Sequence, residues 1–267
     1  MNLTIEEDPS PQKPGTRLFW VESPYQRGRN AVEVLLPPDI GPEEQLHVIY
    51  TLPVNTGTKG NWGCALEELQ KHQVHMRHRV IVVAPAFDVE PWMGDLPEAP
   101  AGGAPWIRQR EYLLKVVIPL IDARFPTRAE AEGRRLIGFS KSAPPALALF
   151  LQHPDLFGAV GLYDNAEPDL VDERFDTWGL AATYGTREHY LTTGPLALLQ
   201  QLDPARKASP PRVVLMAGSA RYEGVNKLRA ALQSAGLPFV DKVFEGMEHT
   251  WQQDWLPSMA DILMSME

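Results

Sequence analysis

The chain has 267 residues, of which 44% are hydrophobic, and it carries a formal net charge of −9. This acidic balance disfavours a nucleic-acid partner, because surfaces that follow phosphates gather lysine and arginine. No apolar run approaches the roughly 18 residues that cross a bilayer, and the acidic, proline-rich residues 1–16 lack the apolar segment of a secretory signal. Together with a lone cysteine, Cys64, these features predict a cytoplasmic protein with no membrane partner.

The N-terminal part of the chain is predicted to be a disordered arm followed by strands. The arm covers residues 1–16. Short runs of apolar and aromatic residues predict strands at 18–21, 31–36, 47–52 and 79–84, and the first two are expected to pair as a hairpin. The last run is almost purely apolar, which is typical of a strand buried on both faces. A helix is expected over 65–75, before that strand.

The rest of the chain alternates between predicted helices and strands. After a loop at 85–105, helices are expected at 108–125, 143–153, 225–235 and from about 256, and strands at 134–139, 158–163, 212–217 and 239–244. Residues 166–209 have no strand pattern and are predicted to form a lid insertion. This alternation predicts one α/β domain over 17–267, with a mostly parallel sheet covered by helices on both faces. Ligands of such sheets bind beyond the carboxyl ends of the strands, where we therefore look for chemistry.

A candidate nucleophile stands between a predicted strand and a predicted helix, in the segment Gly138-Phe139-Ser140-Lys141-Ser142. A sharp strand-to-helix turn exposes a serine hydroxyl above the sheet, and the residues two places before and after it must be small. Gly138 meets that requirement, and Ser142, which stands where glycine is usual, is also small. The alternative is an ordinary turn in which Ser140 only caps the helix.

A candidate general base, His249, follows the last predicted strand and therefore lies at the same sheet edge as Ser140. Neutral imidazole takes a proton from a serine hydroxyl and returns it to the leaving group. A histidine in a loop is by itself weak evidence for a catalytic base. Its place after the serine turn, the insertion and two further strands favours a serine hydrolase with Ser140 as nucleophile.

The chain resembles α/β-hydrolases of the esterase D, feruloyl esterase and mycolyltransferase-antigen type. The resemblance extends from about Leu18 to the C-terminus. Besides the serine turn, it is carried by the segments Leu-Pro-Val-Asn at 52–55, Ile-Pro-Leu-Ile-Asp at 118–122, His-Pro-Asp-Leu-Phe-Gly-Ala-Val at 153–160 and His-Thr-Trp at 249–251. It implies the α/β-hydrolase fold and a serine carboxylesterase.

The third member of the triad has two candidates. The family usually places an Asp after the penultimate strand, at the position that Arg221 occupies here. Glu223, two residues later, is one candidate. The other is Asp164, which follows the preceding strand at 158–163. Both remain open, since each requires only that a carboxylate reach Nδ1 of the histidine.

The oxyanion hole and the substrate pocket are predicted from loop residues. The backbone N–H of Lys141, after the nucleophile, is the first expected donor. The second is expected from Asn55 or Val54, with Asn55 favoured by alignment to the family motif, because Pro53 has no N–H. Four loop tryptophans are expected to bind substrate: Trp62, Trp92, Trp178 and Trp251. His72, His75 and His78 lack a second-ligand pattern such as H-E-x-x-H, so neither a metal nor another cofactor is predicted.

The sequence therefore favours a serine carboxylesterase for short-acyl or aryl esters, including esters of carbohydrates, with a small-molecule ester as its partner. One alternative is an acyltransferase on the same scaffold, which differs only in excluding water. Another is a non-catalytic binding domain, suggested by Arg221 and by the absent His-Gly of the oxyanion loop; a fluorophosphonate probe would not label it. The sequence does not predict an oligomeric state.

Overall fold

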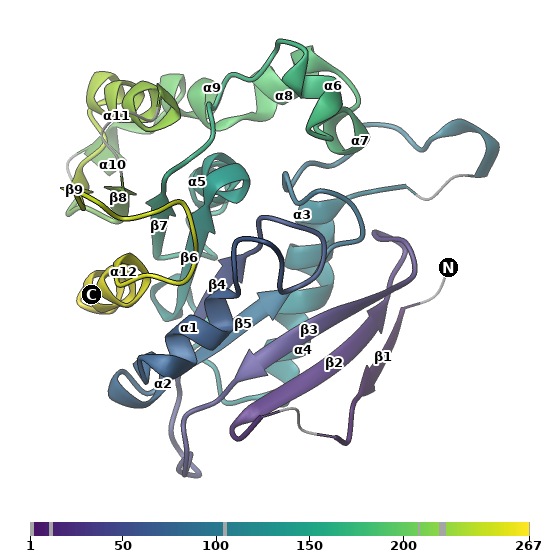
Figure 1. The fold of residues 1–267 in the computed structure, drawn as a ribbon, viewed down its shortest axis with the longest axis vertical. Coiled ribbons are helices and arrows are strands. Elements are labelled where there is room, and N and C mark those ends of the chain that lie inside the picture. The colour runs from purple at the N-terminus through teal and green to yellow at the C-terminus, as the bar shows by residue number, and fades with distance from the viewer. Residues whose placement is uncertain (1–2, 11–12, 104–105, 208, 219–222, 267) are drawn as a thin grey trace.

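The computed structural model describes residues 3–10, 13–103, 106–207, 209–218 and 223–266, and it contains one large central sheet (Figure 1). The strands lie in the order β1-β2-β3-β5-β4-β6-β7-β8-β9. Their bounds are β1 Thr4–Glu7, β2 Thr16–Glu22, β3 Arg29–Leu35, β4 His47–Leu52, β5 Val80–Pro85, β6 Arg134–Phe139, β7 Ala159–Tyr163, β8 Val213–Ala217 and β9 Phe239–Val243. All the strands predicted from apolar runs are present.

The sheet is antiparallel at one edge and parallel elsewhere. β2 and β3 form the predicted hairpin, and β3 pairs antiparallel with β5. From β5 through β4 and β6 to β9 every neighbouring pair is parallel. The carboxyl ends of β4, β6, β7 and β8 therefore meet at one edge of the sheet, which is where the predicted site residues lie.

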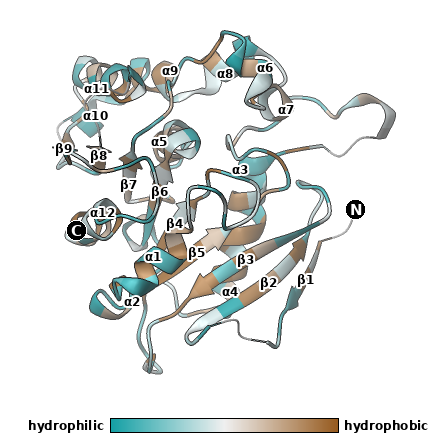
Figure 2. Ribbon diagram, viewed as in Figure 1, coloured by the Kyte–Doolittle hydropathy of each residue, from teal (hydrophilic) through white to brown (hydrophobic). Residues whose placement is uncertain are grey.

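Helices cover both faces of the sheet, as predicted. On one face lie α3 (Gln109–Tyr112), α4 (Ile118–Arg124), α5 (Ala143–Gln152) and α11 (Glu223–Ala235); on the other lie α1 (Ala65–Lys71), α2 (Val74–Arg77) and α12 (Trp255–Met264). Alternate residues of the central strands point into the cores on the two faces. In β5, Ile81 and Val83 pack under α3, α4, α5 and α11, whereas Val80 and Val82 pack under α1, α2 and α12. This strand, β5, is mostly brown in Figure 2. The arrangement confirms the predicted α/β fold.

The insertion between β7 and β8 is helical. It contains α6 (Arg174–Thr177), α7 (Ala181–Tyr184), α8 (Arg187–Thr193), α9 (Pro195–Gln200) and α10 (Pro204–Lys207). The first three lie at the top of the view in Figure 1, beyond the end of α5. Their own small core includes Trp92 from the 85–105 loop together with Phe175 and Tyr184. The insertion and that loop therefore form one packed unit over the carboxyl edge of the sheet.

Two local predictions were wrong. Thr4–Glu7 is not part of a disordered arm, because it forms edge strand β1, with Thr4 opposite Glu22. The helix predicted over 65–75 is interrupted at Gln73, whose φ of 54° separates α1 from α2. Over 108–125 the chain is helical as predicted, but its middle, Leu113–Val117, is a π-helical turn.

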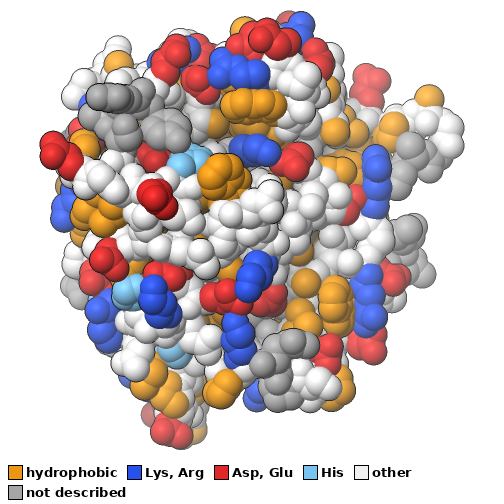
Figure 3. All heavy atoms as spheres, viewed as in Figure 1, with side chains coloured by type: hydrophobic (Ala, Val, Ile, Leu, Met, Phe, Trp, Pro, Cys, Tyr) orange, Lys and Arg blue, Asp and Glu red, His pale blue; other side chains and the backbone are white. Residues whose placement is uncertain are grey.

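The surface is mixed in charge. Figure 3 shows acidic and basic side chains interspersed over one face, with hydrophobic side chains in separate small groups. Among the described residues, no helix is long and apolar enough to cross a membrane.

Candidate active site

Ser140 stands at the sharp turn between β6 and α5. Its φ is 53°, a left-handed conformation that non-glycine residues rarely adopt. Gly138 makes the turn possible, since a Cβ there would lie 2.6 Å from the carbonyl oxygen of Ser142 and 2.7 Å from Cα of Ala143. The backbone at Ser140 is therefore strained, as is expected where a sharp turn holds a serine hydroxyl above a sheet.

Ser142 is a fixed part of this turn. Its hydroxyl, which is fully buried, accepts a hydrogen bond from the N–H of Phe139 (3.1 Å) and donates one to the carbonyl oxygen of Leu52 (2.7 Å). Leu52 is the last residue of β4. The residue that stands in place of the usual glycine therefore ties the serine turn to the start of the 53–55 loop.

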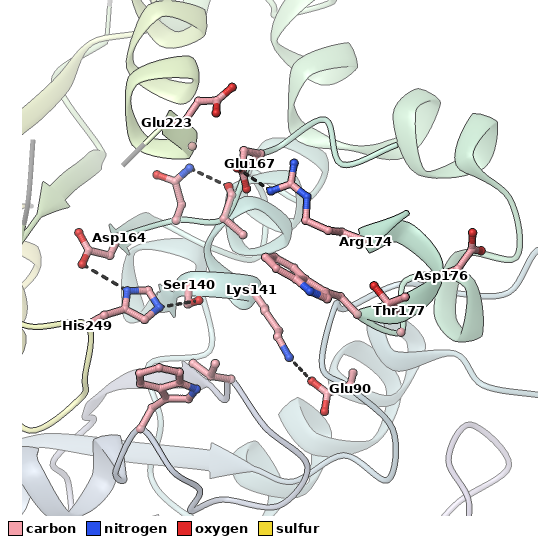
Figure 4. Close-up of a pocket in the computed structure, with 17 residues that line it drawn as sticks. Glu90, Ser140, Lys141, Asp164, Glu167, Arg174, Asp176, Thr177, Glu223 and His249 are labelled. Carbon is pink, nitrogen blue, oxygen red and sulfur yellow. Dashed lines mark hydrogen bonds and ion pairs between the residues drawn. The ribbon is translucent and has the colours of Figure 1, made fainter. Parts of the chain in front are cut away.

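His249 lies beside Ser140, as the order of the elements predicted. Its Nε2 is 2.9 Å from Oγ of Ser140 (Figure 4). The loop that carries it is anchored by Tyr163, whose hydroxyl donates to the carbonyl oxygen of Glu248 (3.0 Å). An imidazole nitrogen at this distance can take the proton of the hydroxyl directly.

Of the two candidate acids, the structure brings Asp164 to His249. One carboxylate oxygen of Asp164 is 3.3 Å from Nδ1 of His249, and the other accepts the N–H of Gly218 at 2.7 Å. The Asp164 side chain is 1% exposed. Glu223, which begins α11, is instead 69% exposed and pairs with Lys227 at 3.0 Å. Arg221, at the family's usual acid position, lies outside the described residues.

The expected oxyanion residues are separated. Lys141 lines the cavity around Ser140, and so does Val54. Asn55 does not: it lines a separate small cavity with Gly60 and Trp251. Val54, the residue that the family alignment did not favour, therefore lines the cavity that contains Ser140, and it lines the separate small cavity as well.

The cavity has a volume of about 620 Å³ and is open to solvent on one side. Two of the four predicted tryptophans, Trp62 and Trp178, line it, and they are 40% and 38% exposed. Trp92 is fully buried and stacks behind Trp178, with the ring centroids 6.5 Å apart. Trp251 is 3% exposed and packs on Phe139, at 5.0 Å between centroids. Trp92 and Trp251 therefore pack behind residues near the site and do not line the cavity. Burial of a large ring stabilises the fold more than its exposure to a wet cavity would.

The charged side chains of the cavity wall are paired with one another or with nearby groups. Lys141 forms an ion pair with Glu90, and Arg174 pairs with Glu167 at 2.8 Å (Figure 4). Glu223 pairs with Lys227, which lies outside the cavity lining. Glu90 and Arg174 were not predicted as site residues. They come from the 85–105 loop and the 166–209 insertion, and neither segment has a motif that signals a position beside Ser140.

The sequence profile of the family described as "Putative esterase" matches residues 23–266. No curated protein sequence matches the chain. Among solved structures, an S-formylglutathione hydrolase from Agrobacterium tumefaciens has a TM-score of 0.74 at 16% identity, covering 98% of this chain and 97% of that one. The fluorophosphonate-binding serine hydrolase FphF of Staphylococcus aureus has 0.67 at 14%, covering 98% and 99%.

A ferulic acid esterase of the anaerobic fungus Anaeromyces mucronatus has a TM-score of 0.57 at 16% identity, covering 99% of this chain and 89% of that one. At such identities the likeness demonstrates a shared fold.

Proposed function

The chain belongs to the Putative esterase family and is a carboxylic-ester hydrolase, and from this premise we propose that Ser140, His249 and Asp164 hydrolyse esters through an acyl-enzyme. The observation that carries the proposal is the 2.9 Å contact between Oγ of Ser140 and Nε2 of His249 at the wall of the cavity. A strained serine, a base within reach and a buried carboxylate behind that base are the parts that acyl transfer requires.

In the first half-reaction, Oγ of Ser140 attacks the carbonyl carbon of the ester while Nε2 of His249 accepts the hydroxyl proton. Asp164 accepts a hydrogen bond from Nδ1, which fixes the tautomer and stabilises the imidazolium. Collapse of the tetrahedral intermediate breaks the bond to the alcohol, which leaves with the proton held by His249.

In the second half-reaction, His249 takes a proton from water, the resulting hydroxide attacks the acyl carbon, and Ser140 leaves with the proton. Negative charge develops on the same carbonyl oxygen in both steps. We assign its donors to the backbone N–H groups of Lys141 and Val54, since both residues line the cavity.

The walls of the cavity favour an uncharged ester with an aryl or short acyl group. Trp178 offers a flat apolar ring. Lys141 and Glu90 both line the cavity and form an ion pair, so their charges offset each other. The name of one relative contains ferulic acid, whose esters are uncharged aryl esters. The name of another contains S-formylglutathione, which carries a net negative charge. We place this chain nearer the former.

The test is kcat/KM of the wild type for p-nitrophenyl butyrate, methyl ferulate and S-formylglutathione. Ser140→Ala should lose about 10⁴-fold or more on every ester that the wild type hydrolyses. Ser234→Ala, which removes an exposed hydroxyl on α11, should leave the rates unchanged. Substantial activity in Ser140→Ala contradicts the mechanism, and a preference for S-formylglutathione contradicts only the substrate class.

A further inference from the structure

Trp62 is a large apolar side chain that is 40% exposed at the mouth of the cavity. Its indole meets the imidazole of His249 edge to face, with 5.1 Å between ring centroids and an angle of 84° between the planes. Aromatic pairs prefer this geometry over a face-to-face stack. The ring therefore contacts the base itself, as well as lining the cavity.

Asp164 is not the only group that bears on the orientation of His249. The 3.3 Å between Nδ1 and Oδ2 of Asp164 is long for a charge-assisted hydrogen bond. The other oxygen of Asp164 is engaged by Gly218. Besides Trp62, the imidazole contacts the buried ring of Phe139, at 4.5 Å between centroids. A core ring and a surface ring therefore both contact the imidazole.

The loop that carries Trp62 is attached to the loop that carries His249. The carbonyl oxygen of Trp62 accepts the N–H of Trp251 (2.9 Å) and the hydroxyl of Thr250 (3.0 Å). Gly63, next in the chain, packs so closely on Gln252 that a Cβ would lie 2.7 Å from its Cγ. The backbone that carries the indole is therefore tied directly to the loop that carries His249.

We propose that Trp62 is a positioning residue for His249: its indole holds the imidazole in the orientation that receives the proton of Ser140. This inference rests on the proposed function and changes the role expected for Trp62, which the sequence assigned to substrate binding. Loss of a positioning residue should lower kcat by a similar factor for every ester. Loss of a residue that only forms the pocket wall should change KM by an amount that depends on the size of the ester.

The experiment compares Trp62→Ala, Trp62→Leu and Trp62→Phe. Two quantities are measured: the second-order rate of labelling by a small alkyl fluorophosphonate, and kcat and KM for p-nitrophenyl acetate and methyl ferulate. Loss of the indole should lower the labelling rate and both kcat values by a similar factor, about tenfold to a hundredfold, with KM little changed. Phe, which keeps an aromatic ring, should restore most of the rate.

Trp62→Leu keeps apolar bulk without a ring, so it should behave like Ala even if Ala lowers the melting temperature. Trp106→Ala removes a comparably exposed tryptophan outside the cavity and should match the wild type. Labelling of Trp62→Ala at the wild-type rate, an increase confined to KM for methyl ferulate, or rescue by Leu as well as by Phe would overturn the inference. If the wild type itself is not labelled, the proposed function fails instead.

Discussion

Asp164 and His249 are 85 positions apart in the chain, yet Oδ2 of the carboxylate lies 3.3 Å from Nδ1 of the imidazole. The topology explains this contact, because Asp164 directly follows β7 and His249 follows β9, and both strands end at the same edge of the sheet. The carboxylate is buried and also accepts the N–H of Gly218, so it is held in place beside His249.

The first prediction compares the two candidate acids. Asp164→Asn should lower kcat by roughly 10⁴-fold, because the amide would stabilise the wrong tautomer and cannot balance the imidazolium charge. Glu223→Gln removes an exposed charge already paired with Lys227, and kcat should change by less than about tenfold. Steady-state kinetics on p-nitrophenyl butyrate measure both. A large loss in Glu223→Gln together with a small one in Asp164→Asn would reverse the assignment.

The second prediction concerns the hydroxyl of Ser142. Ser142→Ala leaves the carbonyl oxygen of Leu52 and the N–H of Phe139 without this partner in the core, so the free energy of unfolding should fall by about 1–3 kcal/mol. Ser258→Ala removes a hydroxyl from the surface of α12 and should cost less than about 0.5 kcal/mol. Urea unfolding measures both values. An unchanged stability in Ser142→Ala would show that the hydroxyl does not tie the turn to β4.

The third prediction concerns the attachment of the lid. Arg110 is buried, and its guanidinium donates to the carbonyl oxygen of Met93 (2.7 Å) and to the hydroxyl of Tyr184 (3.2 Å), which join the 85–105 loop to α7. Burial raises the pKa of nearby Asp95, and the charge of Arg110 opposes that rise. Arg110→Met removes both hydrogen bonds and should loosen the attachment of the insertion. Proteolysis within 166–209 should then be faster than in the wild type, and KM should be higher.

Arg187→Met is the matched control for Arg110→Met. Arg187 lies on the lid surface, where its side chain is 47% exposed and pairs with Asp176. Exposed ion pairs contribute little, so proteolysis should proceed at the wild-type rate. Equal protease sensitivity of Arg110→Met and the wild type would contradict the role assigned to Arg110.

The sequence was most informative where burial decides the pattern. Val80 to Ala84 is β-branched and apolar on both faces, so the strand could be placed without knowledge of its neighbours. Edge strand β1 could not, because three of its four residues are polar and its partners lie on β2. Gln73 is similar: nothing in its side chain signals a positive φ.

For the site, Ser140 and His249 could be singled out because each follows a strand in an order that the fold requires. The acid could not, since Asp164 and Glu223 both follow strands that end at the same edge. Only the approach of Asp164 to Nδ1 separates them in space. Tryptophan positions were equally ambiguous: Trp62 and Trp92 both occupy loops, but the first faces the cavity and the second is buried behind it.

The fourth prediction is that short acyl chains are preferred. The cavity of about 620 Å³ has the indole rings of Trp62 and Trp178 in its wall, and the insertion is packed against the 85–105 loop. Across p-nitrophenyl acetate, butyrate, octanoate and palmitate, kcat/KM should therefore be highest at acetate or butyrate. Trp178→Ala, which widens one wall, should shift the maximum toward longer chains. A wild-type maximum at octanoate or beyond, or activation at an oil–water interface, would indicate a lipase.

The central claim is that Ser140 is the nucleophile of an ester hydrolase, and covalent labelling tests it most directly. The wild type and Ser140→Ala are treated with a fluorophosphonate, digested, and their peptides are mapped by mass spectrometry. Because His249 lies 2.9 Å from its hydroxyl, Ser140 should carry the phosphonyl group in the wild type, and Ser140→Ala should carry none. An unlabelled wild type, or an adduct on a different serine, would contradict the assignment.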